Sequence, residues 1–98
     1  MEIIYNPIFE NQFISIVNTI AFDKPNASIE FALKLEKTIL DIPNHPFKYR
    51  ASFYFNDKNV RDMIYKKYTI IYEVNLDKNR IEILKIFNKN RPITSCCR

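Results

Sequence analysis

Residues 60–74 read VRDMIYKKYTIIYEV, and their composition is that of a β-hairpin. β-branched and aromatic residues, which are common in strands, fill most of these positions. In the later part, Tyr68, Ile70, Tyr72 and Val74 alternate with Thr69, Ile71 and Glu73. Because successive side chains of a strand point to opposite faces, this alternation directs the first set toward a core. We expect two strands, 60–65 and 68–74, joined by a turn at Lys66-Lys67.

Two more segments of the second half, 51–55 and 81–87, have the same strand-like composition. The tripeptide Asp-Lys-Asn separates each of them from the hairpin, at 57–59 and again at 77–79. Asparagine tolerates the left-handed conformation that tight turns need, and the chain has no glycine to supply it. We therefore expect hairpin turns at both tripeptides and a meander of four strands.

The first half has the spacing of helices instead. Residues that can be buried recur at intervals of three and four in two stripes. The first is Phe9, Phe13, Ile16, Val17 and Ile20, and the second is the small residue Ser28 followed by Phe31, Leu35, Ile39 and Ile42. Helix-start signals stand at Asn6-Pro7 and at Asp23-Lys24-Pro25-Asn26. Residues 43–46 contain two prolines and are expected to end the second helix. The short connection between the stripes predicts a helical hairpin.

Together these elements predict an α+β fold. An N-terminal strand at Glu2-Ile3-Ile4-Tyr5 and the two-helix hairpin would pack on a four-stranded, mainly antiparallel sheet. Ile29, Leu33 and Leu40 widen the second stripe, which predicts that this helix packs against both the first helix and the sheet. The hairpin would cover one face of the sheet and leave the other open to a partner. We expect one domain over residues 1–98, with a tail at 93–98.

Several kinds of chemistry are absent from the sequence. Without glycine there is no Gly-rich phosphate loop or dinucleotide fingerprint, so no nucleotide cofactor is expected. Cys96 and Cys97 are adjacent tail residues and His45 stands alone between two prolines, so neither a metal site nor a nucleophile motif is expected. No run approaches the roughly 18 apolar residues of a membrane span, and no signal peptide is recognisable. We therefore expect a cytoplasmic protein.

Charge is divided unevenly along the chain. Three basic and six acidic residues give residues 1–46 a net charge of −3, whereas twelve basic and five acidic residues give 47–98 a net charge of +7. A field of one sign attracts ligands of the opposite sign, so the second half suits a polyanionic or acidic partner. The expected target-binding residues are Arg61, Tyr65, Lys66, Lys67, Arg80, Lys85, Lys89 and Arg91.

Glu73 and Glu82 are a second candidate pair. They are expected to face each other across the last hairpin. Nearby basic residues, such as Arg80 and Lys85, favour solvated surface charges over an acid–base couple.

The order and spacing of these segments, from Asn6 to Pro92, resemble the RelE/ParE family of bacterial toxins. The second helical stripe with its closing Pro46, the strand that bears Arg61, the tyrosine-rich strand 68–74 and the last strand, 81–87, are each similar to elements of that family. The resemblance implies the toxin of a type II toxin–antitoxin system, associated with growth inhibition and plasmid stabilisation. It also implies a cognate antitoxin that wraps the toxin, folds on binding and forms a hetero-oligomer with it.

The resemblance leaves two activities open. ParE-like members are associated with poisoning DNA gyrase, whereas RelE-like members cut messenger RNA on the ribosome with basic residues of the sheet and a His or Tyr near the C-terminus. Here Thr69 stands where many RelE-like members have arginine, and Asn88-Lys89-Asn90 stands where His-Tyr is common. These departures favour a gyrase inhibitor. The alternatives are a ribonuclease that neutralises phosphate with Arg61, Lys67 and Lys85, and an inactive antitoxin-binding module of the same fold.

Overall fold

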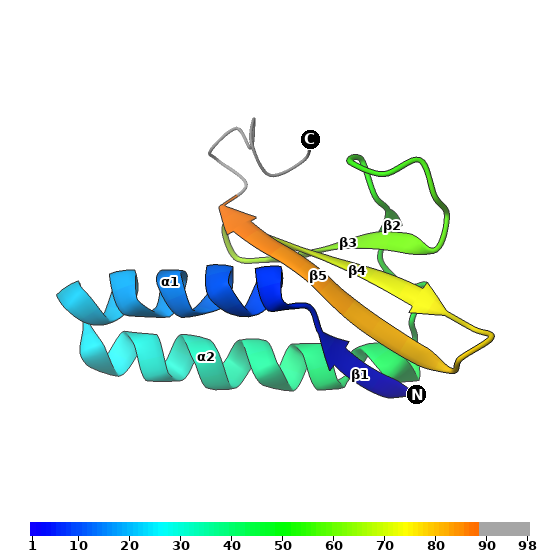
Figure 1. The fold of residues 1–98 in the computed structure, drawn as a ribbon. Coiled ribbons are helices and arrows are strands. Elements are labelled where there is room, and N and C mark those ends of the chain that lie inside the picture. Colours follow the sequence, from blue (N-terminus) through cyan, green and yellow to red (C-terminus); the bar gives the residue numbers. More distant parts are fainter. Residues whose placement is uncertain (89–98) are drawn as a thin grey trace.

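The structure, a computed structural model, describes residues 1–88. Figure 1 shows two helices, α1 (Pro7–Asp23) and α2 (Pro25–Leu40), packed side by side against a sheet. A short 3-10 helix, η1 (Ile42–Asn44), follows α2. The sheet has five strands, which are β1 (Glu2–Tyr5), β2 (Arg50–Ala51), β3 (Val60–Tyr65), β4 (Tyr68–Asn75) and β5 (Arg80–Asn88). The predicted α+β fold is confirmed, with one strand more in the sheet than expected.

The additional strand of the sheet is β1. The strand order is β1-β5-β4-β3-β2, in which β1 runs parallel to β5 and the other neighbouring pairs are antiparallel. The register places Ile3 beside Ile81, so the first and last strands of the described chain are neighbours. Local periodicity predicts a strand but not its distant partner, and for this reason the sequence indicated a sheet of four strands.

The helix boundaries follow the predicted signals. Asn6 caps α1, since its side-chain oxygen accepts a hydrogen bond from the backbone N–H of Ile8 at 2.8 Å, and Pro7 occupies the first turn. Lys24 separates the two helices, and Pro25 opens α2. Because this connection is one residue long, the helices must turn back on each other, as expected for a helical hairpin.

The main core lies between the hairpin and one face of the sheet, which we call the helix face. Both predicted stripes contribute to it: Phe9, Phe31, Leu35, Ile39 and Ile42 are buried there, and Phe13, Ile16, Val17 and Ile20 pack against them. The strands add Met63, Tyr68, Ile70, Tyr72, Val74, Ile81, Ile83 and Ile86. Aromatic rings run through this core, with Tyr5 on Phe9 at 5.6 Å, Phe9 on Phe13 at 5.7 Å and Phe31 on Tyr68 at 5.2 Å between centroids.

The prediction that α2 packs against both α1 and the sheet is confirmed, but three of the residues behind that prediction are not buried. Ile29, Leu33 and Leu40 are 60%, 63% and 57% exposed, although their spacing predicted burial. The face of α2 that carries Phe31, Leu35 and Ile39 is the one that reaches the core. Within residues 1–88 no further element lies over the rest of the α2 surface, so the widened stripe faces solvent.

The second face of the sheet, which we call the loop face, is not fully open as predicted. Val60, Ile71 and Phe87 are buried on it, and Phe55 and Leu84 pack against them. The cover is the segment 52–59, because β2 ends at Ala51 instead of continuing to Phe55 as predicted. Asp57-Lys58-Asn59 does form a turn, with the Val60 N–H donating to the Asp57 carbonyl oxygen at 3.1 Å, but it closes a longer loop and not a tight hairpin.

The other two turns are as predicted. Lys66 and Asn79 adopt positive φ angles of 55° and 52°, which lets the chain reverse without glycine. Glu73 and Glu82 are paired in the register, which confirms that they face each other. Asn6 Nδ2 donates to Glu82 Oε2 at 2.9 Å, so this carboxylate also ties the start of α1 to β5.

Candidate functional site

The expected target-binding residues do not gather at one place in the sheet. Lys66 and Lys67 form the exposed turn between β3 and β4, whereas Arg80 begins β5 at the opposite end. The register pairs Tyr68 with Asn88 and Asn75 with Arg80. About 23 Å of strand therefore separates the lysine turn from Arg80.

Arg61 lies on the helix face, where three groups hold its side chain. Its Nε donates to the Lys58 carbonyl oxygen at 2.9 Å, and its Nη1 donates to the Tyr49 carbonyl oxygen at 3.0 Å. The guanidinium also lies 4.9 Å from the centre of the Phe47 ring. These contacts attach the segments on either side of β2 to the sheet, so Arg61 has a structural task in this fold.

Lys85 lies on the other face of the sheet from Arg61. Its partner in the register is Ile71 of the loop-face cluster, whereas Arg61 is paired with Tyr72 of the main core. Two basic side chains on opposite faces of one sheet cannot contact the same phosphate. The structure therefore does not bring Arg61 and Lys85 together, as a shared phosphate site would require.

Tyr65 belongs to the margin of the main core. Its ring lies 5.9 Å from that of Phe31, and the ammonium groups of Lys66 and Lys67 lie 5.8 Å from the ring centres of Tyr65 and Tyr68. Two cations above two aromatic rings give this turn a positive surface with restricted side chains. The remaining predicted residues, Lys89 and Arg91, lie outside the described residues, as do Cys96 and Cys97.

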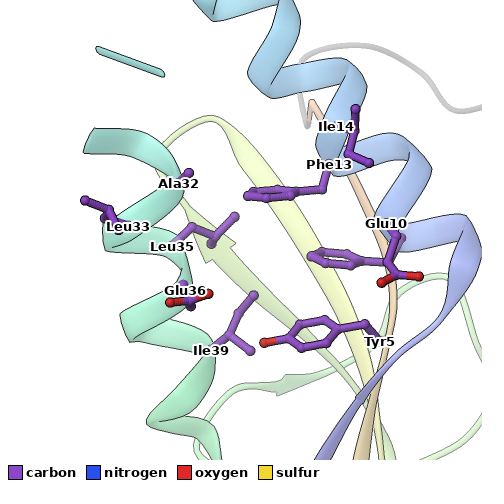
Figure 2. Close-up of a pocket in the computed structure, with 10 residues that line it drawn as sticks. Tyr5, Glu10, Phe13, Ile14, Ala32, Leu33, Leu35, Glu36 and Ile39 are labelled. Atoms are coloured by element: carbon purple, nitrogen blue, oxygen red, sulfur yellow. The ribbon is translucent and has the colours of Figure 1, made fainter. Parts of the chain in front are cut away.

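A groove between α1 and α2 is a second candidate site, and sequence reasoning missed it. This hairpin groove encloses a hollow of about 290 Å³. Figure 2 shows the rings of Tyr5 and Phe13 directed across it toward Leu35 and Ile39 of α2. Ile14 and Leu33, which are 55% and 63% exposed, also line it. Large apolar side chains around an open groove mark a surface that binds another molecule.

Two carboxylates give the hairpin groove its charge. Glu10 of α1 and Glu36 of α2 line it, and both side chains are exposed. Burial, and to a lesser degree the charge of Glu36, raises the pKa of the Tyr5 hydroxyl. The hydroxyl therefore stays neutral at physiological pH. The groove is lined mainly by apolar side chains, and its charged lining residues, Glu10 and Glu36, are negative. Such a groove suits an apolar ligand that carries positive charge.

A third group of residues surrounds a buried carboxylate on the loop face, and sequence reasoning missed it as well. Asp62 is 1% exposed, and its Oδ2 accepts a hydrogen bond from the Phe53 backbone N–H at 3.1 Å. Arg50 Nη2 lies 3.6 Å from the same oxygen. The sequence signal was the row of aromatic and basic residues at 47–55, but their arrangement depends on Asp62, which is distant in the chain.

The remaining candidates show no arrangement for catalysis. His45 Nε2 lies 3.1 Å from Asp41 Oδ2, a contact between the end of α2 and the turn that follows it. Among residues 1–88 there is no cluster of three or more His, Cys, Asp or Glu side chains that could hold a metal ion. Neither α1 nor α2 combines the length and the apolar character needed to cross a membrane.

Comparisons with known proteins agree with this fold. A solved structure described as "Chromosomal ParDE TA system from P. aeruginosa" is similar, with a TM-score of 0.75 and 13% sequence identity over 90% of this chain and 95% of that chain. No match is found among curated proteins. A family model described as "ParE toxin of type II toxin-antitoxin system, parDE" matches residues 3–92. The chain therefore belongs to the ParE family of toxins of type II toxin–antitoxin systems.

Proposed function

We propose that this chain inhibits bacterial growth by binding DNA gyrase and that a cognate antitoxin neutralises it. Membership of the ParE toxin family supports the toxin role, and the similar solved structure is described as a toxin–antitoxin system. A plasmid that carries such a pair would be retained, because cells that lose the plasmid also lose the source of the antitoxin that protects them.

The structural observation that favours gyrase over messenger RNA is the placement of Arg61 and Lys85 on opposite faces of the sheet. A nuclease without His must surround the reacting phosphate with cations. The guanidinium of Arg61 is instead bonded to the carbonyl oxygens of Lys58 and Tyr49. This arrangement favours a toxin that acts by binding.

The hairpin groove is the proposed docking site of the antitoxin. An amphipathic helix would place its apolar side chains against Phe13, Ile14 and Leu33, and a basic residue on it would meet Glu10 or Glu36. Charge complementarity thus predicts a basic segment in the part of the antitoxin that covers the hairpin. Burial of the exposed apolar residues would supply much of the binding free energy.

The target is tested with one preparation of the purified protein. We expect it to inhibit supercoiling of relaxed plasmid by gyrase, and to leave messenger RNA on translating ribosomes intact. Cleaved messenger with unaffected supercoiling would replace this proposal with the nuclease. Binding of an antitoxin without an effect on either target would identify an inactive antitoxin-binding module.

The docking site is tested with a pair of exposed leucines. Leu33→Asp places a charge in the hairpin groove beside Glu36, whereas Leu76→Asp makes the same change in the turn after β4, where Leu76 is also 63% exposed. We expect Leu33→Asp to weaken antitoxin binding by at least tenfold and Leu76→Asp to leave it unchanged. Gyrase inhibition should survive in both variants. Equal affinity of the two variants for the antitoxin would contradict a docking site in the groove.

A further inference from the structure

Three consecutive aromatic residues of the loop over the sheet, Phe53, Tyr54 and Phe55, have different environments. The Tyr54 ring meets the Phe87 ring edge-on at 5.3 Å, and Phe55 packs against Val60 and Phe87 on the loop face. Phe53, in contrast, is 76% exposed. Tyr54 and Phe55 therefore attach the loop to the sheet, whereas the Phe53 ring lies in solvent and contributes little to the core.

Both the backbone and the exposed ring of Phe53 nevertheless have a partner. The carboxylate of Asp62, whose side chain is fully buried, accepts the Phe53 backbone N–H at 3.1 Å and faces Arg50 Nη2 at 3.6 Å. Arg50 in turn places its guanidinium 4.1 Å from the centre of the Phe53 ring. Burying a carboxylate is costly, and here the carboxylate holds the Phe53 backbone and faces the arginine that lies over the Phe53 ring. We call the Phe53 ring and the Arg50 guanidinium over it the plate. It offers an exposed flat surface on which a ligand could stack.

The surroundings of this plate are positively charged. Lys58 is exposed on the same loop, and residues 47–59 contain three basic residues against the single acidic residue Asp57. One of the three, Lys48, has its ammonium 5.4 Å from the centre of the Tyr49 ring, which packs on the helix face. In the sheet, the register aligns Arg50, Asp62, Ile71 and Lys85 in one row across four strands of the loop face. Glu73 and Glu82 form the next row of that face toward Val60, so the positive surface ends there.

We propose that Arg50 and Phe53 form a stacking platform for the unpaired bases of a nucleic acid strand, with Lys58 and Lys85 placed for its phosphates. An aromatic ring and a guanidinium plane both stack on bases, whatever the sequence, and basic residues beside them follow the backbone. A protein partner fits less well. The centre of a protein interface is poor in lysine, and its binding residues enter desolvated pockets, whereas this plate has Lys58 on its own loop and Lys85 in its row of the sheet, and it is exposed to water.

The test is a titration of the full chain with fluorescein-labelled oligonucleotides of about 12 nucleotides, followed by anisotropy. We expect oligothymidylate to bind, with an affinity that falls as salt rises. Phe53→Ala should weaken binding by about five- to 150-fold, the range for loss of one base–aromatic stack, whereas Phe53→Tyr should retain it. The matched control is Phe22→Ala, since Phe22 is 94% exposed but lies on α1.

Titrations with oligouridylate and with a duplex of the same length show whether the bound nucleic acid is RNA, single-stranded DNA or duplex. Tighter binding of the RNA assigns the platform to RNA, and equal or tighter binding of the DNA assigns it to single-stranded DNA. Duplex binding as tight as that of the single strands would overturn the proposal, because paired bases cannot reach the ring. So would equal losses from Phe53→Ala and Phe22→Ala, or the absence of binding. If Phe53→Ala abolishes gyrase inhibition without any effect on oligonucleotides, the platform instead binds protein.

Discussion

The two faces of the sheet are stabilised in different ways. On the helix face, two helices bury a large cluster of aliphatic and aromatic side chains, and the buried hydroxyl of Tyr72 donates to the Pro46 carbonyl oxygen at 2.7 Å. On the loop face, the buried cluster is Val60, Ile71 and Phe87, and beside it lies the buried carboxylate of Asp62. The comparison indicates that the helix face carries most of the stability, while the loop face positions the exposed residues that we propose bind a nucleic acid strand.

The largest expected effect is on the helix face. Leu35 is fully buried in the main core, so Leu35→Ala should lower the free energy of unfolding by about 2–5 kcal/mol. Leu33 lies two residues away on α2 and is 63% exposed, so Leu33→Ala should cost less than about 1 kcal/mol. Urea unfolding of both variants measures the difference. Similar losses would mean that the exposed side of α2 is covered in solution, for example by a second copy of the chain.

A smaller effect is expected on the loop face. Asp62→Ala removes the acceptor of the Phe53 N–H and the partner of Arg50, which should cost about 1–3 kcal/mol. The loop 52–59 should also loosen, so chymotrypsin should cleave near Phe53 and Tyr54 faster than in the wild type. Asp62→Asn is the control, because it keeps an oxygen acceptor without the charge. A loss as large as that of Leu35→Ala would break the distinction between the two faces.

Most of the fold could be predicted because its signals are local. The buried stripe with Phe31, Leu35 and Ile39, the cap at Asn6 and the turn at Lys66-Lys67 each depend on residues within a few positions of one another. The parallel pairing of β1 with β5 depends on residues nearly 80 positions apart and has no local signal. The exposure of Leu33 was missed for a related reason. Spacing shows which residues lie on the same side of a helix, but it does not show whether another element covers that side.

The candidate sites were predicted less well than the fold. Sequence reasoning selected residues by type and charge, and thereby grouped Arg61 with Lys85, which the strand register places on opposite faces. It also missed the pairing of Arg50 with Asp62, because that contact exists only when β2 lies beside β3. Charge could identify the basic half of the chain, but only the register determines which basic residues lie on the same face.

The smallest expected effect concerns the buried hydroxyl of Tyr72, which is neutral, in contrast to the buried carboxylate of Asp62. Tyr72→Phe removes the hydroxyl that donates to the Pro46 carbonyl oxygen, which should cost about 1 kcal/mol near neutral pH. Burial is the main reason that the pKa of this hydroxyl is raised above its ordinary value of 10.0, and Tyr49 adds to the shift while Arg61 opposes it. In alkaline solution the unfolded tyrosine therefore ionises while the folded one stays neutral.

The sign of the pH effect follows from this difference. The unfolded state releases its proton first, so the stability that Tyr72 contributes is complete below its unfolded pKa and is lost as pH rises toward the folded pKa. Phenylalanine has no proton to lose, and the other tyrosines and lysines titrate equally in both proteins. The advantage of the wild type over Tyr72→Phe should therefore shrink by about 1 kcal/mol between about pH 8 and about pH 11. Urea unfolding at the two pH values measures it, and a constant difference would mean that water reaches the hydroxyl and the helix face is more open than its core implies.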